Sequence, residues 1–292
     1  MRTLFSAFAG IAAVVLCFVA VPGLWLDRNV VSEDGFVQMV SPLGSDAEFQ
    51  EQLTQATAQT VIEDASLGPA LTEMVRPLVQ QAAENLTENP QYQQAWEETL
   101  RRSHELTFPG NPGNPGNSGN AGGSSGAPET DTAAAITLDI APIVSLAAQE
   151  AAAAVGAEVP VPEQVLVDVG GSNQQTVIAM VQNYADLAVP FAIAAAVAFG
   201  LAMLIARRRS TTLVFIGIGV AIAAGLWKLG AEYVVRQLET SQDANELAGL
   251  FKGYFADVAE SSFNEWIFAG AGAGAVMILV GVIARIFAGS RT

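Results

Sequence analysis

Four long stretches without a single charged residue constrain this chain more than any other feature. They are Thr3–Leu26, Leu187–Ala206, Ser210–Trp227 and Trp266–Ala284. About 20 apolar residues, rising about 1.5 Å each, cross a hydrocarbon layer of roughly 30 Å, so each stretch can span a membrane. In lipid such segments must be helical, because only then are their backbone hydrogen bonds satisfied. The sequence therefore predicts four transmembrane helices, at 1–26, 187–206, 210–231 and 266–286.

The charges that flank these stretches are segregated by sign. All 29 acidic residues fall on one side of a four-span arrangement. The other side carries basic residues alone, namely Arg2, Arg207–Arg209, Arg285 and Arg291. Basic flanks stay cytoplasmic, so we expect both termini inside the cell and the protein in the plasma membrane. Trp25, Trp227 and Trp266 would then lie at the outer ends of their helices, where indole rings favour the headgroup layer.

The first stretch could also be read as a cleaved signal peptide. Its apolar run is longer than the usual core of about 7–15 residues, and Phe18 spoils the nearest small-residue cleavage site. Cys17 invites a lipoprotein interpretation, but the bulky Leu16 precedes it and it lies in mid-helix. We therefore expect residues 1–26 to be an uncleaved anchor.

Residues 27–186 are predicted to form an extracytoplasmic domain that is α-rich with a small β element. Ser45-Asp46-Ala47-Glu48 is typical of a capping box that starts a helix. A second helix is expected over 67–86, and a third between the cap Asn89 and Pro109. Two alternating segments, 136–140 and 164–169, predict short strands that pair across an intervening helix. The fold class is thus mainly α, a four-helix transmembrane bundle with this domain attached.

Glycine recurs at every third position from Gly110 to Gly122 in the segment FPGNPGNPGNSGNAGGSSGAPETD. Collagen needs this period over a much longer run, so a collagen rod is not expected. Gly, Asn, Ser and Pro bury too little apolar surface to offset the entropy of ordering. Because residues 133–186 are too few for a core of their own, we interpret 109–132 as a disordered loop inserted within one domain.

Four short motifs carry a resemblance to a known family. They are DRNVVSEDGFVQMVSPLGSD after the first span, Trp96 through RRSH at His104, ITLDIAPIV at 136–144, and VLVDV at 165–169. In these the chain resembles a family of actinobacterial multi-pass integral membrane proteins that is uncharacterised in activity. The resemblance implies that the segment between the histidine helix and the LDI strand is a variable insertion. It implies no catalytic role for any residue.

His104 is the single histidine and the centre of the one candidate polar cluster, with Arg101 and Asp139. One interpretation is proton transfer or ligand binding by an envelope hydrolase that pairs His104 with Asp139 or Glu105. The other is a core histidine, because His104 shares a helical face with Trp96 and Leu100. One histidine and one cysteine cannot build a zinc or haem site, and no nucleotide-binding or calcium-loop motif occurs. We expect no cofactor and no metal.

The remaining candidate residues are small or apolar. Small residues four apart let helices approach closely, either within the bundle or with a partner. The predicted helix-packing residues are Ala192, Ala196, Gly200, Gly217, Ala221, Gly225, Gly270 and Gly274. An amphipathic helix at 246–260, within the outer loop 232–265, is expected to lie on the membrane surface or against the outer domain. Its contact face is Leu247, Leu250, Phe251, Tyr254, Phe255 and Val258.

The function that these features favour is non-catalytic. A net charge of −16 argues against nucleic acid as a partner. The acidic outer domain is predicted to bind or scaffold a protein partner in the cell envelope, as an accessory subunit of a larger membrane complex, while the spans contact membrane lipids. The alternatives are a transport or lipid-handling component and a hydrolase that uses His104.

Overall fold

The structure is a computed structural model of the 292-residue chain, and it describes residues 2–53, 86, 89–108, 137–155, 163–168, 174–240 and 246–289. The expected loop at 109–132 and nearly all of the expected helix at 67–86 lie outside the described residues. The chain is mainly helical with one small two-stranded sheet, as the sequence predicts. It divides into two compact units. Unit 1 comprises 1–31, 180–239 and 259–292, and unit 2 comprises 32–179 and 240–258.

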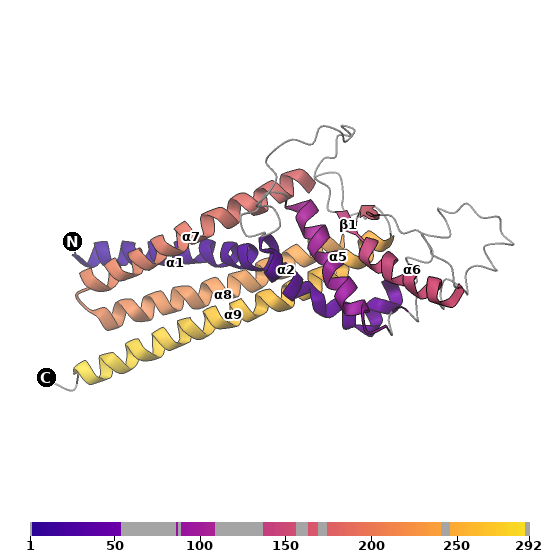
Figure 1. Cartoon of the computed structure of the whole chain (residues 1–292). Coiled ribbons are helices and arrows are strands. Elements are labelled where there is room, and N and C mark those ends of the chain that lie inside the picture. Colours follow the sequence, from indigo (N-terminus) through magenta and orange to yellow (C-terminus); the bar gives the residue numbers. More distant parts are fainter. Residues whose placement is uncertain are drawn as a thin grey trace. The chain divides into compact units, whose positions relative to one another are not determined.

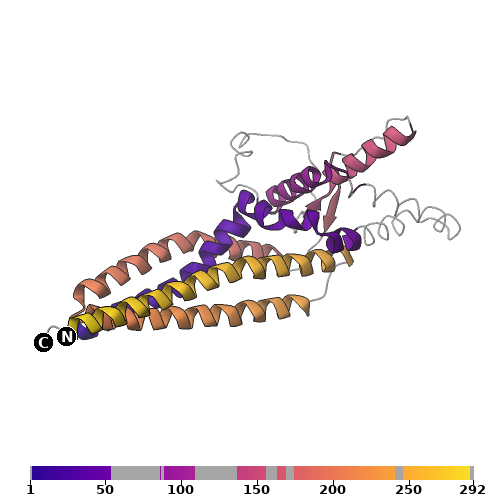
Figure 2. The ribbon, with the colours of Figure 1, turned by 90° about the horizontal axis from the view of Figure 1, so that it is seen from below.

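Unit 1 is built from long apolar helices (Figures 1 and 2). They are α1 (Arg2–Leu26), α7 (Gln174–Ile205), α8 (Arg209–Glu239) and α9 (Glu246–Gly289). All four are long and apolar enough to cross a membrane, with mean hydropathies of 2.6, 2.4, 2.0 and 2.3 in chain order. The chain is therefore a membrane protein. A π-helical turn, η1 (Asp27–Val31), follows α1 directly.

Two of these helices extend well beyond their expected spans. α7 has 32 residues, so the helix expected at 174–186 runs into the second span without a break. α9 has 44 residues and joins the expected amphipathic helix at 246–260 to the fourth span. Since α9 contains no proline, nothing interrupts its hydrogen-bond ladder at the junction. A continuous helix that enters a span cannot also lie flat on the membrane surface, so that interpretation of 246–260 is corrected.

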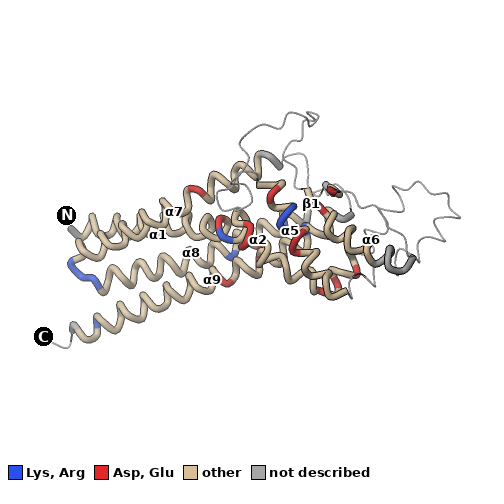
Figure 3. The backbone as a smooth tube through the Cα atoms, in the orientation of Figure 1, with Lys and Arg blue, Asp and Glu red and all other residues tan. Residues whose placement is uncertain are grey.

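Acidic residues of the unit 1 helices are confined to one end of the bundle, whereas basic residues occur at both ends (Figure 3). The basic segment between α7 and α8 lies at the same end of the bundle as the two chain termini. The acidic residues of these helices lie toward the opposite end, where α1 ends and α7 enters the unit. The bundle thus preserves the asymmetry that the sequence predicts.

Pro22 leaves a gap in the hydrogen bonding of α1, because its nitrogen cannot donate to the carbonyl of Phe18 four residues earlier. The indole Nε1 of Trp227, on α8, donates to that carbonyl at 3.0 Å. Tyr184, on α7, donates its hydroxyl to the neighbouring carbonyl of Val19 at 2.6 Å. Two helices that are distant in sequence therefore donate hydrogen bonds to α1 beside Pro22, and the bond from Trp227 replaces the one that Pro22 cannot make.

Small residues bring α8 and α9 into close contact. A Cβ added at Gly217 would lie 2.8 Å from the carbonyl oxygen of Gly274, and one added at Gly274 would lie 2.8 Å from that of Gly217 and 3.1 Å from the nitrogen of Ala221. A Cβ at Gly270 would meet the Trp227 ring at 3.0 Å. Side chains larger than hydrogen at 217 and 274 would therefore force the two backbones apart.

Other predicted packing residues do not meet a neighbouring helix of this chain. A Cβ at Gly200 or Gly225 would have nothing within 4 Å, and Ala196 is exposed while Ala192 is only half-buried. A row of residues four apart drifts by about 40° per step around a helix of 3.6 residues per turn, so a row that starts at a contact leaves it. On α7 the buried alanines are Ala185, Ala188 and Ala202 instead. That these predicted residues contact a second chain stays a prediction.

Unit 2 centres on α5 (Tyr92–Thr107), which packs against two other parts of the unit. On one side lie α2 (Glu33–Val40) and the 3₁₀ turn η2 (Ser41–Ser45), followed by helical residues 47–53. On the other lie β1 (Thr137–Asp139), α6 (Ala141–Val155) and β2 (Leu166–Asp168). β1 and β2 pair antiparallel, with Leu138 opposite Val167, which confirms the expected pairing across a helix.

The helix over 47–53 begins with a different cap from the expected one. Asp46 Oδ1 accepts the backbone N–H of Phe49 at 2.8 Å, so Asp46 is the capping residue. Ser45, expected in this role, ends η2 and donates its hydroxyl to Gln93 on α5 at 3.0 Å. The preceding 3₁₀ turn shifts the start of the helix by one residue. At α5 the N-cap is Gln91 and has no side-chain cap bond, so the expected cap Asn89 lies two residues too early; its Oδ1 accepts the N–H of Gln91 at 2.7 Å in the turn before the helix.

Aromatic rings form the core of unit 2, and the start of α9 belongs to this core. Tyr254 packs edge-on to Phe49 with ring centroids 5.0 Å apart, and Phe49 in turn packs on Trp96 at 5.5 Å. Phe255 lies 6.1 Å from both Phe36 and Phe251. The predicted contact face of 246–260 is thus used for packing inside unit 2. Leu250 and Val258 are half-buried there, and the side chain of Leu247 lies outside the described set.

The bond from Trp227 to α1 yields a double-mutant test. Trp227→Phe keeps most of the ring but leaves the Phe18 carbonyl unpaired, and we expect it to destabilise unit 1 by roughly 0.6–1.7 kcal/mol. In a Pro22→Ala background the restored N–H of residue 22 satisfies that carbonyl, so the same substitution should cost clearly less. Unfolding of the four proteins in mixed detergent micelles measures the coupling. Equal costs in both backgrounds would show that the two residues are independent.

Candidate binding groove

His104 is enclosed by aromatic rings. Its side chain is 3% exposed, and its imidazole centroid lies 5.3 Å from that of Phe36 and 4.9 Å from that of Phe108. A hydrolytic histidine must reach solvent and substrate. The neighbouring Glu105 lies on the exposed side of α5. The imidazole therefore occupies the position of a core side chain between α2 and the end of α5.

Asp139 holds the strand β1, the helix α6 and the start of β2 together. Its Oδ1 accepts the backbone N–H of Ala141 at 3.1 Å, in the manner of a helix cap, and that of Val165 at 3.0 Å. Its own N–H donates to Ser103 Oγ on α5 at 2.9 Å. A carboxylate that is 1% exposed and bound in this way serves the backbone around it.

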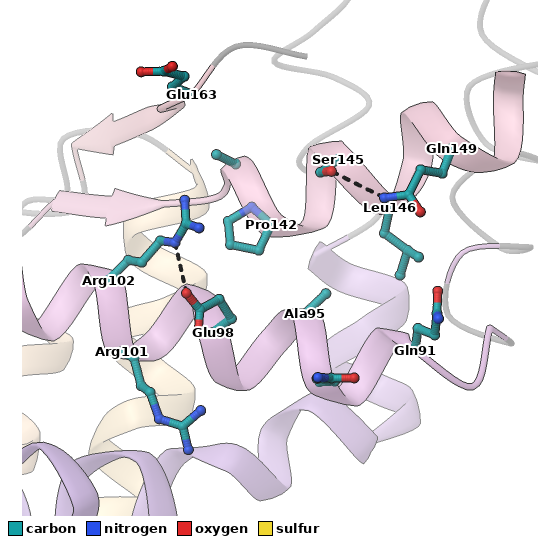
Figure 4. Close-up of a pocket in the computed structure, with 12 residues that line it drawn as sticks. Gln91, Ala95, Glu98, Arg101, Arg102, Pro142, Ser145, Leu146, Gln149 and Glu163 are labelled. Carbon is teal, nitrogen blue, oxygen red and sulfur yellow. Dashed lines mark hydrogen bonds and ion pairs between the residues drawn. The ribbon is translucent and has the colours of Figure 1, made fainter. Parts of the chain in front are cut away.

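The arginine that approaches Asp139 is Arg102, not the predicted Arg101. Arg102 Nη1 lies 4.0 Å from Asp139 Oδ2, and its Nε lies 3.0 Å from Glu98 Oε1. Arg101 forms an ion pair with Glu33 of α2 at 3.9 Å. Adjacent residues on a helix are about 100° apart, so the two guanidinium groups leave α5 on different sides. Figure 4 shows Arg102 directed toward the strands and Arg101 directed away from them.

The predicted trio of Arg101, His104 and Asp139 is therefore divided among three environments. The residues that sequence reasoning missed are Arg102 and Ser103, which bind the Asp139 carboxylate and backbone. One signal could have found this arrangement. Asp139 stands close before a helix that begins Ala141-Pro142, and aspartate before a helix together with proline in its first turn is typical of a capped helix start.

A groove of about 760 Å³ runs between α5 and α6 (Figure 4). Its apolar part is formed by Ala95, Ala141, Pro142 and Leu146. Its polar part combines three glutamines, one serine and four charged residues, namely Gln91, Gln94, Gln149, Ser145, Glu98, Arg101, Arg102 and Glu163. The groove thus offers uncharged hydrogen-bonding groups along its length and a guanidinium near the β-strands.

Among the described residues of unit 2 that lie outside the candidate spans, Glu33 and Tyr92 have raised pKa values. Burial, and then the nearby carboxylate of Asp34, raises the pKa of Glu33, although Arg101 acts in the opposite direction. Burial among Leu86 and Leu146 raises the pKa of Tyr92 to about 12. Because the folded state holds the tyrosine proton more tightly than the unfolded state does, the stability that Tyr92 contributes is lost as pH rises from about 10 through 12.

A second polar cluster joins α8 to α9 in unit 1. The ammonium of Lys228 binds Glu260 at 2.7 Å and Asn264 at 3.2 Å, with Glu232 at 3.9 Å. Glu232 also pairs with Arg236 at 3.6 Å, so both carboxylates have a cationic partner and the cluster fastens α8 to α9. Among the described residues no group of histidine, cysteine and carboxylate side chains could hold a metal ion.

Comparisons with known proteins add no function to this geometry. No protein-family model, no curated protein and no solved structure matches the chain.

A structural role for Asp139 predicts a large effect on stability. Asp139→Ala removes the cap of α6, the bond to Val165 and the partner of Arg102, and we expect a loss of roughly 2–4 kcal/mol. Asp139→Asn keeps a carbonyl oxygen for the two N–H groups and should cost clearly less. Thermal unfolding followed by circular dichroism measures both. An Asp139→Ala protein as stable as the wild type would show that Asp139 has no structural role.

Proposed function

We propose that the protein is a non-catalytic, membrane-anchored component of the cell envelope whose unit 2 binds a partner protein. The observation that supports this most is the use made of its candidate catalytic groups. His104 is packed between two phenyl rings, and Asp139 is committed to backbone N–H groups and Arg102. The groove between α5 and α6, by contrast, is open and lined by groups suited to recognition.

The proposal places unit 2 outside the cytoplasm. Its support is the positive-inside rule, because the basic ends of α7, α8 and α9 gather at one end of unit 1 and the acids of these helices toward the other. We expect a cysteine at Gln94, in a Cys17→Ala background, to react with a membrane-impermeant maleimide in intact cells. A cysteine at Ser210, beside the basic turn, should react only after permeabilisation. The reverse pattern would invert the orientation.

Transport or lipid handling is the alternative function. It requires an apolar cavity that opens to the bilayer between the spans. The groove described above is in unit 2, and eight of its twelve lining residues are polar or charged, which does not suit an acyl chain.

The partner is tested by site-specific crosslinking in the native membrane. A photoreactive phenylalanine analogue would replace Leu106, exposed on α5, or Leu279, exposed on the α9 span. We expect a stoichiometric protein adduct from position 106, identified by mass spectrometry after gentle detergent extraction. A chain that is recovered alone or as a homo-oligomer, without adducts at 106, would overturn the accessory-subunit proposal. Crosslinks to lipid at position 279, without a protein adduct at position 106, would favour transport or lipid handling.

A further inference from the structure

We propose that the basic end of unit 1 binds the phosphate of anionic phospholipids through Arg207, Arg208, Arg209 and Arg285. The first three lie at the turn from α7 to α8, and Arg285 lies near the end of α9. All four side chains are exposed. This site adds a lipid ligand to the protein. It does not rest on the function proposed for unit 2, and it holds for either orientation of the chain in the membrane.

The packing of α9 on α8 brings Arg285 toward the arginine turn. A Cβ added at Gly281 would lie 2.8 Å from the carbonyl oxygen of Ser210, so Gly281 faces the first turn of α8. Gly274 faces Ala221, which is further along α8, so the two helices run antiparallel. Arg285 lies four residues beyond Gly281, on nearly the same face and one turn closer to the arginines. Residues far apart in sequence therefore gather into one cluster of positive charge.

The start of α1 lies at the same level of the bundle. A Cβ added at Gly10 would lie 3.4 Å from Cγ1 of Ile216, and one added at Gly219 would lie 2.8 Å from Cγ2 of Val14. These contacts show that α1 and α8 run in the same direction, and both helices begin about two turns before the first of them. The apolar first turns of α1 therefore flank the arginine cluster.

No acidic group neutralises the four arginines within the part of the chain that the structure describes. None of them forms an ion pair there, whereas Arg101, Arg102 and Lys228 each face a carboxylate. The first turn of α8 contains no acidic residue, and the amino end of a helix adds a partial positive charge. Positive groups that lie close together repel one another, so a bound anion is favoured at this end.

Exposed apolar side chains beside the arginines indicate that the anion is a lipid. Leu204 is exposed at the end of α7, Phe5 is exposed near the start of α1, and Ile286 is exposed next to Arg285. In a membrane such side chains contact acyl chains, and arginines that border them lie at the level of the headgroups. A phospholipid carries its phosphate directly above its acyl chains, so both parts of the molecule meet matching surface. A soluble anion would use the arginines alone.

The guanidinium groups select the charge of the headgroup. Arginine binds phosphate oxygens with two parallel hydrogen bonds. A zwitterionic headgroup brings its own cation into the cluster, and this cation is repelled by the arginines. Each basic side chain near an anionic surface strengthens attachment about fivefold. The site therefore favours anionic over zwitterionic phospholipids.

The test measures lipid binding to the purified full chain in detergent micelles by native mass spectrometry. The probes are phosphatidylglycerol, which is anionic, and phosphatidylcholine, which is zwitterionic, with the same acyl chains. Arg208→Gln/Arg285→Gln removes one arginine from each part of the cluster. Arg28→Gln/Arg236→Gln removes the same charge from exposed positions at the other end of unit 1, in η1 and in the last turn of α8.

We expect the wild type to bind phosphatidylglycerol at least tenfold more tightly than phosphatidylcholine. Arg208→Gln/Arg285→Gln should weaken phosphatidylglycerol about tenfold and phosphatidylcholine less than twofold, while the control pair should change both less than twofold. Equal affinities of the wild type for the two lipids would overturn the inference without any variant. Equal effects of the two double substitutions on phosphatidylglycerol would overturn it as well.

Soluble compounds distinguish a lipid site from a site for free phosphate. Glycerophosphoglycerol carries the headgroup of phosphatidylglycerol without acyl chains. We expect that neither this compound nor inorganic phosphate displaces phosphatidylglycerol at the concentration of lipid that saturates the site. Displacement by either compound at that concentration, or displacement by an RNA oligonucleotide, would overturn the assignment to lipid. Crosslinking at position 106 reports on unit 2 and tests the proposed function separately.

Discussion

Every backbone polar group inside a lipid-spanning helix must find a partner, and this constraint shapes unit 1. α1 violates it at one point, because Pro22 cannot donate to the Phe18 carbonyl. The solution comes from other helices. Trp227 of α8 donates to Phe18 and Tyr184 of α7 donates to the next carbonyl, so a local defect becomes a specific contact among three helices. Close packing of α8 on α9 through Gly217 and Gly274 then adds van der Waals contact, which is the main attraction available in lipid.

In unit 2, side chains satisfy the buried backbone groups that secondary structure leaves without a partner. Asp139 satisfies the first turn of α6 and the start of β2, and its negative charge is balanced at one edge by Arg102. The interaction has a consequence at the surface. Because Glu98 lies at Nε and Asp139 at Nη1, the Arg102 guanidinium is held between two carboxylates along one wall of the groove. A residue group that resembles a catalytic cluster in sequence thus supports the backbone of β1, α6 and the start of β2.

The sequence predicted the parts of the fold that depend on local patterns. Uncharged runs located the four spans, and alternation located the two strands that pair as β1 and β2. Contacts between residues 165 and 209 positions apart, such as those from Tyr184 and Trp227 to α1, follow no local period and could not be predicted. Gly225 and Gly200 were predicted as packing residues, but a Cβ at either position would have nothing within 4 Å. A regular spacing of small residues does not show where along its length a helix diverges from its neighbour. Of the site, the sequence located Asp139 but paired it with the wrong arginine.

Charges in the groove between α5 and α6 are compensated locally, although the chain as a whole is acidic. A net charge of −16 describes the whole chain, but charges separated by more than about 8–10 Å are largely screened at physiological ionic strength. The lining of the groove contains two arginines, two glutamates and otherwise neutral groups. Arg101 and Glu33 compensate each other, and so do Arg102 and Glu98. The long-range field of the protein therefore disfavours the approach of anions to the groove, while the surface of the groove itself is close to neutral, because each of its arginines has a carboxylate partner.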